Sequence, residues 1–367
     1  MRKLILLIFI SCNVLAAGCT EGGERVSVEE LALVSSIGFD FVDDEEMRMT
    51  VGIPQPAGES PVLTETYSAN TKMIQEGLVD ISSQADKMLI LNQLRTILFS
   101  EEFAKNGRVT EVVKHFYRDA ALGNKVRIVI VKDQVEDILK ADYKENQHMD
   151  AYLNDLFQPK LHNSFSPFTT IHDYINAQTN PVFHTMVPYL EKKGESLKVT
   201  KIAVFDNEKM ADTISTEHSL LLQALRGLEK LAPIAVEFKE NEIDKQLFLE
   251  RINSVVKVTT NRNIESPKVS IDLKVKAVLV EYKGDRDLNK IGEDKKLEKE
   301  INKNLEKEIE DILKKLQELE LDPVGFSEYF RMYHKGKWTD ELTKKVTAAS
   351  EYKVTVKFKI LNTGTLK

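Results

Sequence analysis

The stretch VSIDLKVKAVL, from Val269 to Leu279, places an apolar residue at every second position, with mostly polar residues between them. This period of two predicts a strand with one buried face and one exposed face, which is typical of an antiparallel sheet. The same alternation returns near the C-terminus, at Tyr352, Val354, Val356, Phe358 and Ile360. We therefore expect the C-terminal part of the chain to contain a sheet with long strands.

A long charged segment between these two stretches has the period of a helix. Its apolar residues advance by three or four positions, while lysine and glutamate fill the other faces: Leu297, Ile301, Leu305, Ile309, Ile312, Leu316 and Leu319. Pro323 predicts the end of this helix, because proline disfavours helical backbone in the residue before it. The apolar stripe favours a helix lying across its own sheet, and a coiled-coil seam to a partner is the alternative.

Aromatic residues gather directly after this helix, at Phe326, Tyr329, Phe330, Tyr333 and Trp338. Large aromatic side chains supply much of the buried area of protein cores, so we expect this cluster to pack in or near the core. The alternative is a ligand pocket lined by these rings.

The first part of the chain alternates strand patterns with helix patterns. Strands are predicted at 47–53, 94–99, 126–131, 187–190 and 199–205, the last two as a hairpin, and helices at 29–36, 70–91, 134–139, 150–157, 170–177 and 217–228. Ser100 is the predicted N-cap of a further short helix that starts with Glu101 and Glu102, and Gly107 suits its C-terminal turn. Strands separated by helices indicate mixed α/β layers.

These patterns predict an α+β protein with three mixed α/β domains. We expect an N-terminal α/β domain at 28–145, a small middle domain at 146–212, and a C-terminal α+β domain at 213–367 whose antiparallel sheet packs with long helices. A chain of 367 residues usually makes two or three domains. Its formal net charge of −7 provides no overall basic surface, so we expect no nucleic acid partner.

The N-terminus has the pattern of an export signal. Met1-Arg2-Lys3 is a positive n-region, Leu4 to Ile10 is an apolar h-region, and the small residues of 14–18 predict a signal-peptidase site. The alternative is a membrane-spanning helix, but Ser11 and Asn13 interrupt an apolar run that is shorter than the roughly 20 residues a span requires. We therefore expect residues 1–18 to be a signal peptide.

Cys19 follows the small residues at which this signal peptide is expected to end. The string Leu15-Ala16-Ala17-Gly18-Cys19 resembles the lipobox of bacterial lipoproteins, with its leucine one place early. The resemblance implies that Cys19 receives a diacylglycerol and becomes the new N-terminus, followed by a flexible tether that ends at residue 27. Two or three acyl chains anchor a protein far more firmly than one. The alternative is an incidental cysteine at a soluble cleavage site.

Three strings of the N-terminal half resemble the Ger(x)C family: SVEELALVSSIGFDF, SEEFAKNGRVTEVVKHFYRDA and VRIVIVKDQVEDIL. The members of this family are the lipoprotein C subunits of nutrient-germinant receptors in endospore-forming bacteria. The middle string matches a family motif at Glu101, Glu102, Ala104, Gly107, Arg118 and Asp119. The string LKKLQELELDPVGFSEYFRMYHKGKW is similar to a C-terminal family segment at Gln317, Asp322, Gly325, Phe326 and Trp338. The resemblance spans nearly the whole chain after the signal peptide.

This resemblance implies a lipid-anchored, non-enzymatic receptor subunit at the outer face of the inner spore membrane. Its implied partners are membrane lipid, through acylated Cys19, and two integral-membrane germinant-receptor subunits with which it triggers germination. A stand-alone solute-binding lipoprotein, which captures a small nutrient in a cleft between domains, is the alternative.

The sequence contains no pattern that points to an enzyme. Its seven histidines lack the paired spacing with Cys, Asp or Glu that zinc sites favour: His115, His148, His162, His172, His184, His218 and His334. No Gly-x-Ser-x-Gly, P-loop or dinucleotide motif is present. We therefore expect no catalytic residue, no metal and no cofactor, and histidines that are exposed or hydrogen-bonded. Cys19 is the one residue with an expected chemical role, as a lipid attachment point.

Overall fold

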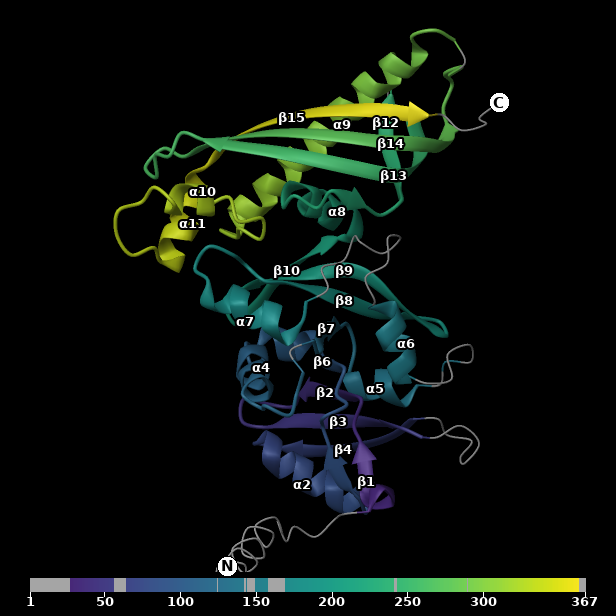
Figure 1. Cartoon of the computed structure of the whole chain (residues 1–367), viewed down its shortest axis with the longest axis vertical. Coiled ribbons are helices and arrows are strands. Elements are labelled where there is room, and N and C mark those ends of the chain that lie inside the picture. Colours follow the sequence, from purple (N-terminus) through teal and green to yellow (C-terminus); the bar gives the residue numbers. More distant parts are fainter. Residues whose placement is uncertain are drawn as a thin grey trace, which may run out of the picture.

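The computed structural model describes residues 27–55, 64–123, 125–141, 143, 149–157, 169–240, 243–288 and 290–362. Within these ranges the chain forms two large sheets, which follow one another along the long axis of the molecule (Figure 1). The expected signal peptide, Cys12, Cys19 and the tether up to residue 26 lie outside the described residues, as do His148 and His162.

The first sheet has eight strands in the order β10-β9-β8-β7-β6-β2-β3-β4. They are β2 (Ser36–Phe41), β3 (Met47–Pro54), β4 (Thr64–Thr71), β6 (Thr96–Ser100), β7 (Arg127–Val131), β8 (Met186–Lys193), β9 (Ser196–Asp206) and β10 (Lys209–Ser215). The central strands β2, β6, β7 and β8 run parallel, and antiparallel strands extend the sheet on both sides. The hairpin predicted at 187–190 and 199–205 is confirmed as β8 and β9.

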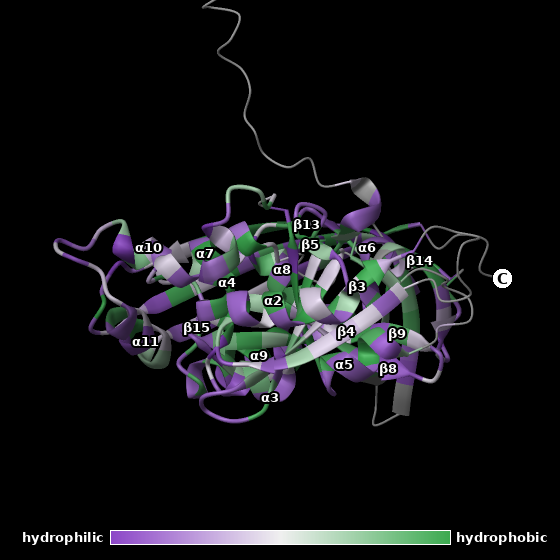
Figure 2. Ribbon diagram, turned by 90° about the horizontal axis from the view of Figure 1, so that it is seen from below, coloured by the Kyte–Doolittle hydropathy of each residue, from purple (hydrophilic) through white to green (hydrophobic). Residues whose placement is uncertain are grey.

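Helices cover both faces of this sheet, and each face has its own apolar core. The helices are α2 (Ile74–Ala85), α3 (Glu101–Lys105), α4 (Val109–Tyr117), α5 (Val135–Lys140), α6 (Met149–Leu156) and α7 (Ile171–Thr179). Residues of α2, α3, α4 and α7 share a core with Ile97, while residues of α5 and α6 share the other with Leu98. Neighbouring residues of β6 enter different cores because successive strand side chains point to opposite faces. Figure 2 shows the resulting alternation of apolar and polar residues along the elements.

The segment 29–36 is not the helix that its pattern predicted. A 3-10 turn, η1 (Val28–Glu30), leads into β1 (Leu31–Leu33), and β2 begins at Ser36. β1 pairs in parallel with β5 (Met88–Ile90), which follows α2 in the chain. The prediction was wrong because pairing with a distant strand outweighs a weak local helical preference.

Two helix starts show how local and distant capping compare. The predicted cap at Ser100 is confirmed, since its hydroxyl accepts the N–H of Phe103 at 3.3 Å, and Gly107 closes the turn after α3 with a φ of +84°. At α5, by contrast, the buried carboxylate of Asp40 on β2 accepts the N–H groups of Val135 at 2.7 Å and Glu136 at 3.1 Å. Side-chain oxygens at such positions satisfy N–H groups that have no partner within the helix.

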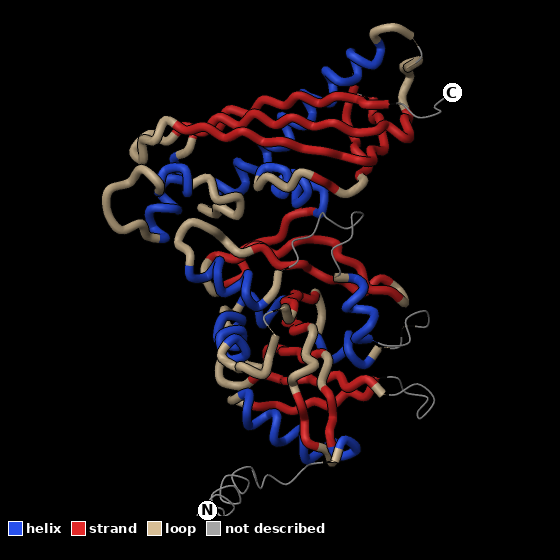
Figure 3. Tube along the Cα trace, viewed as in Figure 1, coloured by secondary structure: helices blue, strands red, loops and turns tan. Residues whose placement is uncertain are grey.

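The second half begins with α8 and forms a smaller, strongly elongated sheet (Figure 3). Its elements are α8 (Thr216–Leu225), β11 (Lys230–Leu231), β12 (Ile234–Glu240), β13 (Ile243–Thr260), β14 (Lys268–Lys283), α9 (Glu293–Glu318), α10 (Glu328–Arg331), α11 (Asp340–Ala349) and β15 (Glu351–Asn362). The strand order is β11-β13-β14-β15, and β12 also pairs with β13.

The α+β fold class is confirmed, but this sheet is not antiparallel throughout. β14 pairs antiparallel with β13 and parallel with β15. The chain leaves β14, runs back along α9 and re-enters the sheet in the same direction, which is the connection that a parallel neighbour requires. An alternating pattern of apolar residues is the same for both strand directions, so the sequence did not distinguish them.

The apolar stripe of α9 is buried in its own chain, which confirms the internal packing. Leu297, Ile301 and Ile309 are fully covered and share a core with Leu273 of β14 and Phe358 of β15. A second row of α9 side chains covers the edge of β15: Glu298, Asn302 and Glu306 accept the N–H groups of Ile360, Phe358 and Val356 at 2.8, 2.6 and 2.9 Å. Free N–H groups of an edge strand invite pairing with another chain, and here they are satisfied.

The aromatic cluster after α9 is largely core. Phe326, Phe330 and Trp338 are buried, which confirms packing for these three, whereas Tyr333 is 52% exposed and lies under the guanidinium of Arg262 at 3.9 Å.

Within the described ranges, no helix is both long enough and apolar enough to cross a membrane.

The proposed domain boundaries at 145 and 212 cross continuous structure. β7 and β8 lie on opposite sides of residue 145 and pair through Ile130 with Tyr189 and Val131 with Leu190. One apolar core also runs from Val131 in the first sheet to Leu273 in the second. The three-domain division of 28–145, 146–212 and 213–367 stays a prediction about folding units.

Candidate functional site at the junction of the two sheets

The chain between α9 and α10 turns around the carboxylate of Asp322. This side chain is 2% exposed and accepts the N–H groups of Gly325 at 2.7 Å, Phe326 at 3.0 Å and Ser327 at 2.7 Å. Gly325 has a φ of +88°, and a Cβ at this position would lie 1.9 Å from the ring of Phe183. Glycine is therefore required by backbone conformation and by space. The turn as a whole comes to lie against the segment that precedes β8.

His184 joins this turn to the first sheet through two hydrogen bonds. The backbone N–H of His184 donates to the backbone carbonyl of Asp322 at 3.2 Å. The backbone N–H of Asp322 donates to Nδ1 of the His184 imidazole at 2.8 Å. Because Nδ1 accepts this hydrogen bond, the neutral ring carries its hydrogen on Nε2. Nε2 lies 3.9 Å from a carboxylate oxygen of Asp206 and 3.9 Å from one of Asp340, and it has no hydrogen-bond partner among the described residues.

Burial lowers the pKa of His184 below its ordinary value, although the carboxylates of Asp322, Asp340 and Asp206 act in the opposite direction. Lys344 of α11 adds a positive charge to the same group, with Nζ 2.7 Å from Asp206 and 3.4 Å from Asp340. Lys344 thus offsets one of the two negative charges, and His184 remains uncharged near neutral pH.

α11 is fixed to the first half of the chain by further polar contacts. The hydroxyl of Thr343 donates to the carbonyl of Pro181, and the indole N–H of Trp338 donates to Thr343 at 2.8 Å. The side chain of Asn207, in the turn between β9 and β10, donates to Asp340 at 3.2 Å. These bonds bring residues from three distant parts of the chain into one group.

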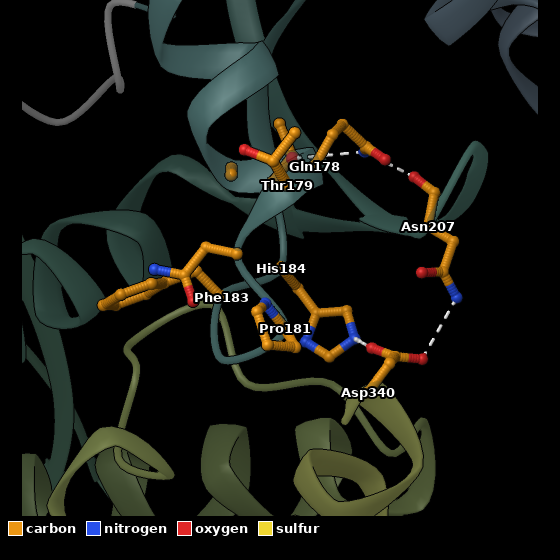
Figure 4. Close-up of a pocket in the computed structure, with 10 residues that line it drawn as sticks. Gln178, Thr179, Pro181, Phe183, His184, Asn207 and Asp340 are labelled. Carbon is orange, nitrogen blue, oxygen red and sulfur yellow. Dashed lines mark hydrogen bonds and ion pairs between the residues drawn. The ribbon is translucent and has the colours of Figure 1, made fainter. Parts of the chain in front are cut away.

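Figure 4 shows these residues around a small pocket. His184 points toward Asp340, and Gln178 at the end of α7 donates to the carbonyl of Asn207 at 2.5 Å. The pocket has a volume of about 140 Å³ and opens between the end of α7 and the start of α11. Its polar groups mostly bond one another.

A second connection lies at the other end of β10. Lys315 of α9 forms an ion pair with Asp212 at 2.8 Å and donates to the carbonyl of Thr213 at 3.0 Å. The two sheets are therefore linked by side chains of α9 and α11 and by the Asp322 turn. We call these contacts together the junction.

The sequence analysis singled out Asp322, Gly325, Phe326 and Trp338 as motif residues, and the structure brings all four to the junction. It did not single out His184, which is 138 positions from Asp322. Its one available signal was its place just before a predicted strand, since the partners of His184 are dispersed along the chain. The described residues contain no group of three or more His, Cys, Asp or Glu arranged to hold a metal ion.

The motif of the first half has a similar structural role. Glu101 accepts a hydrogen bond from the hydroxyl of Tyr189 on β8 and pairs with Lys105 at 2.5 Å. The carboxylate therefore connects the start of α3 to a strand in the middle of the sheet. Cys19, the one predicted attachment site, lies outside the described residues.

Two family models match consecutive parts of the chain. Residues 24–192 match the model described as spore germination protein N-terminal domain, and residues 200–364 match the model described as spore germination B3/GerAC like, C-terminal. Together they cover most of the 367 residues.

Individual relatives agree with this assignment. The chain is 26% identical to spore germination protein GerQC of Bacillus cereus over 99% of both chains, and 20% identical to spore germination protein KC of Bacillus subtilis strain 168 over 92% of this chain and 89% of that protein. The crystal structure of the GerBC protein has the same fold, with a TM-score of 0.57 at 16% identity, covering 89% of this chain and 97% of that chain. The chain belongs to the Ger(x)C family of spore germination proteins.

Proposed function

We propose that this Ger(x)C protein is a lipid-anchored, non-enzymatic C subunit of a nutrient-germinant receptor. In this proposal Cys19 carries the lipid, the protein lies at the outer face of the inner spore membrane, and it acts with two integral-membrane receptor subunits. The family ties the chain to spore germination. The observation that carries the proposal is the match of both halves, in order, to spore germination models.

The position of the first described element supports anchoring through Cys19. Eight residues, 20–27, separate Cys19 from η1 at Val28. An extended chain spans at most about 3.6 Å per residue, so this tether reaches about 29 Å. η1 and β1 lie at the end of the molecule remote from the second sheet (Figure 1). Lipid on Cys19 would thus hold the first sheet beside the bilayer.

The use of polar groups at the junction supports a non-enzymatic role. The carboxylate of Asp322 accepts hydrogen bonds from three backbone N–H groups, and Nδ1 of His184 accepts the backbone N–H of Asp322. Asp206 and Asp340 share Lys344. A general base needs a free lone pair within reach of the proton that it removes. These groups are instead committed to holding the chain together.

Metabolic labelling with a radioactive fatty acid tests the anchor. Cys19→Ala should abolish labelling and release the protein from the membrane fraction, because the attachment sulfur is gone. Cys12→Ala is the matched control, since Cys12 is the only other cysteine and lies within the expected signal peptide. Equal labelling of Cys19→Ala and the wild type would refute lipid attachment at Cys19.

Germination assays test the receptor role. Deletion of the gene should impair germination in response to some nutrients while vegetative growth is unchanged. Two integral-membrane proteins should copurify with a tagged form of the protein from spore membranes. Normal germination of the deletion strain with every nutrient tested would contradict the proposal, as would recovery of the tagged protein without membrane subunits.

A further inference from the structure

A cavity of about 420 Å³ lies in the second half of the molecule, between the sheet and the helices α8 and α9, and opens to solvent beside the exposed residues Glu217 and Glu237. Its walls are mostly apolar, and the lining includes Leu220, Ala224, Leu249, Leu273, Leu305 and Phe358. Protein interiors rarely leave voids larger than a water molecule, because each lost contact reduces stability. An apolar cavity of this size is a site for a small apolar molecule or group.

The charged groups that line this cavity are all acidic. Glu217 stands in the first turn of α8, Glu237 on β12 and Glu308 on α9, and no lysine, arginine or histidine is among the described lining residues. Glu237 accepts a hydrogen bond from Gln246 at 2.7 Å, and Glu308 accepts one from Asn304 at 2.8 Å.

None of these three carboxylates forms an ion pair within the described part of the chain. Glu217 and Glu237 are exposed, whereas Glu308 is half-buried on the turn of α9 that follows Leu305 and lies beside the apolar walls of the cavity. Burial raises the pKa of Glu308. The hydrogen bond from Asn304 and the imidazole of His218 act in the opposite direction, and the carboxylates of Asp311 and Glu217 act in the same direction as burial. A half-buried carboxylate in this setting gains from a cation that shares its site.

We propose that this cavity binds a small organic ammonium ion with an aliphatic body. The hydrocarbon part would lie against Leu273, Leu305 and Phe358, and the ammonium group would lie at the acidic end, within reach of Glu308. The inference goes beyond the proposed receptor role and does not depend on it, because every lining residue lies in the second half and none of them forms the junction contacts described above.

Isothermal titration calorimetry on the full chain carrying Cys19→Ala, which removes the expected lipid, provides the test. The probes are butylammonium, hexylammonium and octylammonium, with octan-1-ol and octanoate as matched ligands of different charge. Each added methylene should tighten the dissociation constant about fourfold, which corresponds to about 0.8 kcal/mol per buried CH₂. Octylammonium should bind at least tenfold more tightly than octan-1-ol, and octanoate should bind most weakly.

Two substitutions separate the acidic group from the apolar walls. Glu308→Gln should weaken octylammonium at least fivefold and leave octan-1-ol unchanged, whereas Glu310→Gln, on the exposed side of the same helix, should change neither. Ala224→Phe places a ring in the cavity and should weaken both ligands, with circular dichroism confirming that the variant folds.

Three results would overturn the proposal. The first is the absence of heat with every ammonium probe up to millimolar concentration. The second is equal affinity for octylammonium and octan-1-ol, which would show an apolar site without recognition of charge. The third is an equal effect of Glu308→Gln and Glu310→Gln. The comparison of octylammonium with octan-1-ol needs no substitution in the cavity, so it tests the proposal even where Ala224→Phe fails to fold.

Discussion

Asp322→Ala should destabilise the junction more than any exposed substitution, because one carboxylate holds three buried N–H groups there. The substitution leaves the N–H groups of Gly325, Phe326 and Ser327 without their acceptor. A hydrogen bond to a charged group contributes about 1.5–3 kcal/mol, so three of them sum to at least about 4.5 kcal/mol. This is a large share of the about 5–15 kcal/mol that is typical of a folded domain.

Asp322→Asn gives an intermediate case with the same shape. Its remaining oxygen can keep the two bonds of Oδ1, to Gly325 and Phe326, but its amide group then faces the N–H of Ser327, donor against donor. We expect a loss of about 2 kcal/mol, from one missing bond and an unsatisfied N–H group. The order of stability should be wild type, then Asn, then Ala.

Urea unfolding of the full chain carrying Cys19→Ala measures these differences. Trp338 is the only tryptophan and is buried at the junction, so its fluorescence reports this region, while circular dichroism reports the whole chain. Asp272→Ala, on the exposed face of β14, is the matched control and should change the unfolding free energy by less than about 0.5 kcal/mol. An effect of Asp322→Ala no larger than that of Asp272→Ala would refute the reasoning.

Three further predictions concern charge and edge protection. Burial keeps the pKa of His184 below its ordinary 6.5, so below about pH 6.5 the unfolded chain binds a proton that the folded chain does not. The unfolding free energy should therefore fall as the pH drops below about 6.5. His184→Asn should reduce this pH dependence, measured by urea unfolding between about pH 7.5 and 5.5. Asn302→Ala should speed hydrogen exchange at the N–H of Phe358 and cost about 1 kcal/mol, and unchanged exchange would contradict this. Lys274 of β14 lies directly opposite Lys357 of β15, and like charges at such positions repel. Lys274→Glu should therefore raise the unfolding free energy by about 0.5 kcal/mol, and a lower unfolding free energy in the variant would contradict this prediction.

Much of the fold could be predicted because its patterns are local. The strands at 269–279 and 352–360 and the helix between them follow from periodic burial, and they appear as β14, β15 and α9 with most of the expected residues buried; Leu319, Tyr352 and Ile360 are partly buried. The cap at Ser100 was equally readable, since an N-cap and its N–H partner are three residues apart. Such signals depend on spacing within a single element.

The rest could not be predicted because it depends on contacts between distant residues. The parallel direction of β15 comes from the path of α9, and the strand at 31–33 comes from pairing with β5. At the candidate site, His184 meets Asp322 and Asp340 only after both sheets are assembled. No spacing in the sequence encodes that meeting. His184 is hydrogen-bonded as expected, but its burial among carboxylates could not be predicted.

The junction also changes what the C-terminal motif implies. As a string, Asp322, Gly325 and Phe326 could equally have marked a ligand loop or a structural turn. In the structure the carboxylate faces inward to its own backbone, the glycine admits the ring of Phe183, and the backbone of Asp322 bonds His184 in both directions. These bonds consume the polar groups that a ligand would need, and they join a turn of the second half to the start of β8 in the first. The motif therefore serves to fix one half of the molecule on the other.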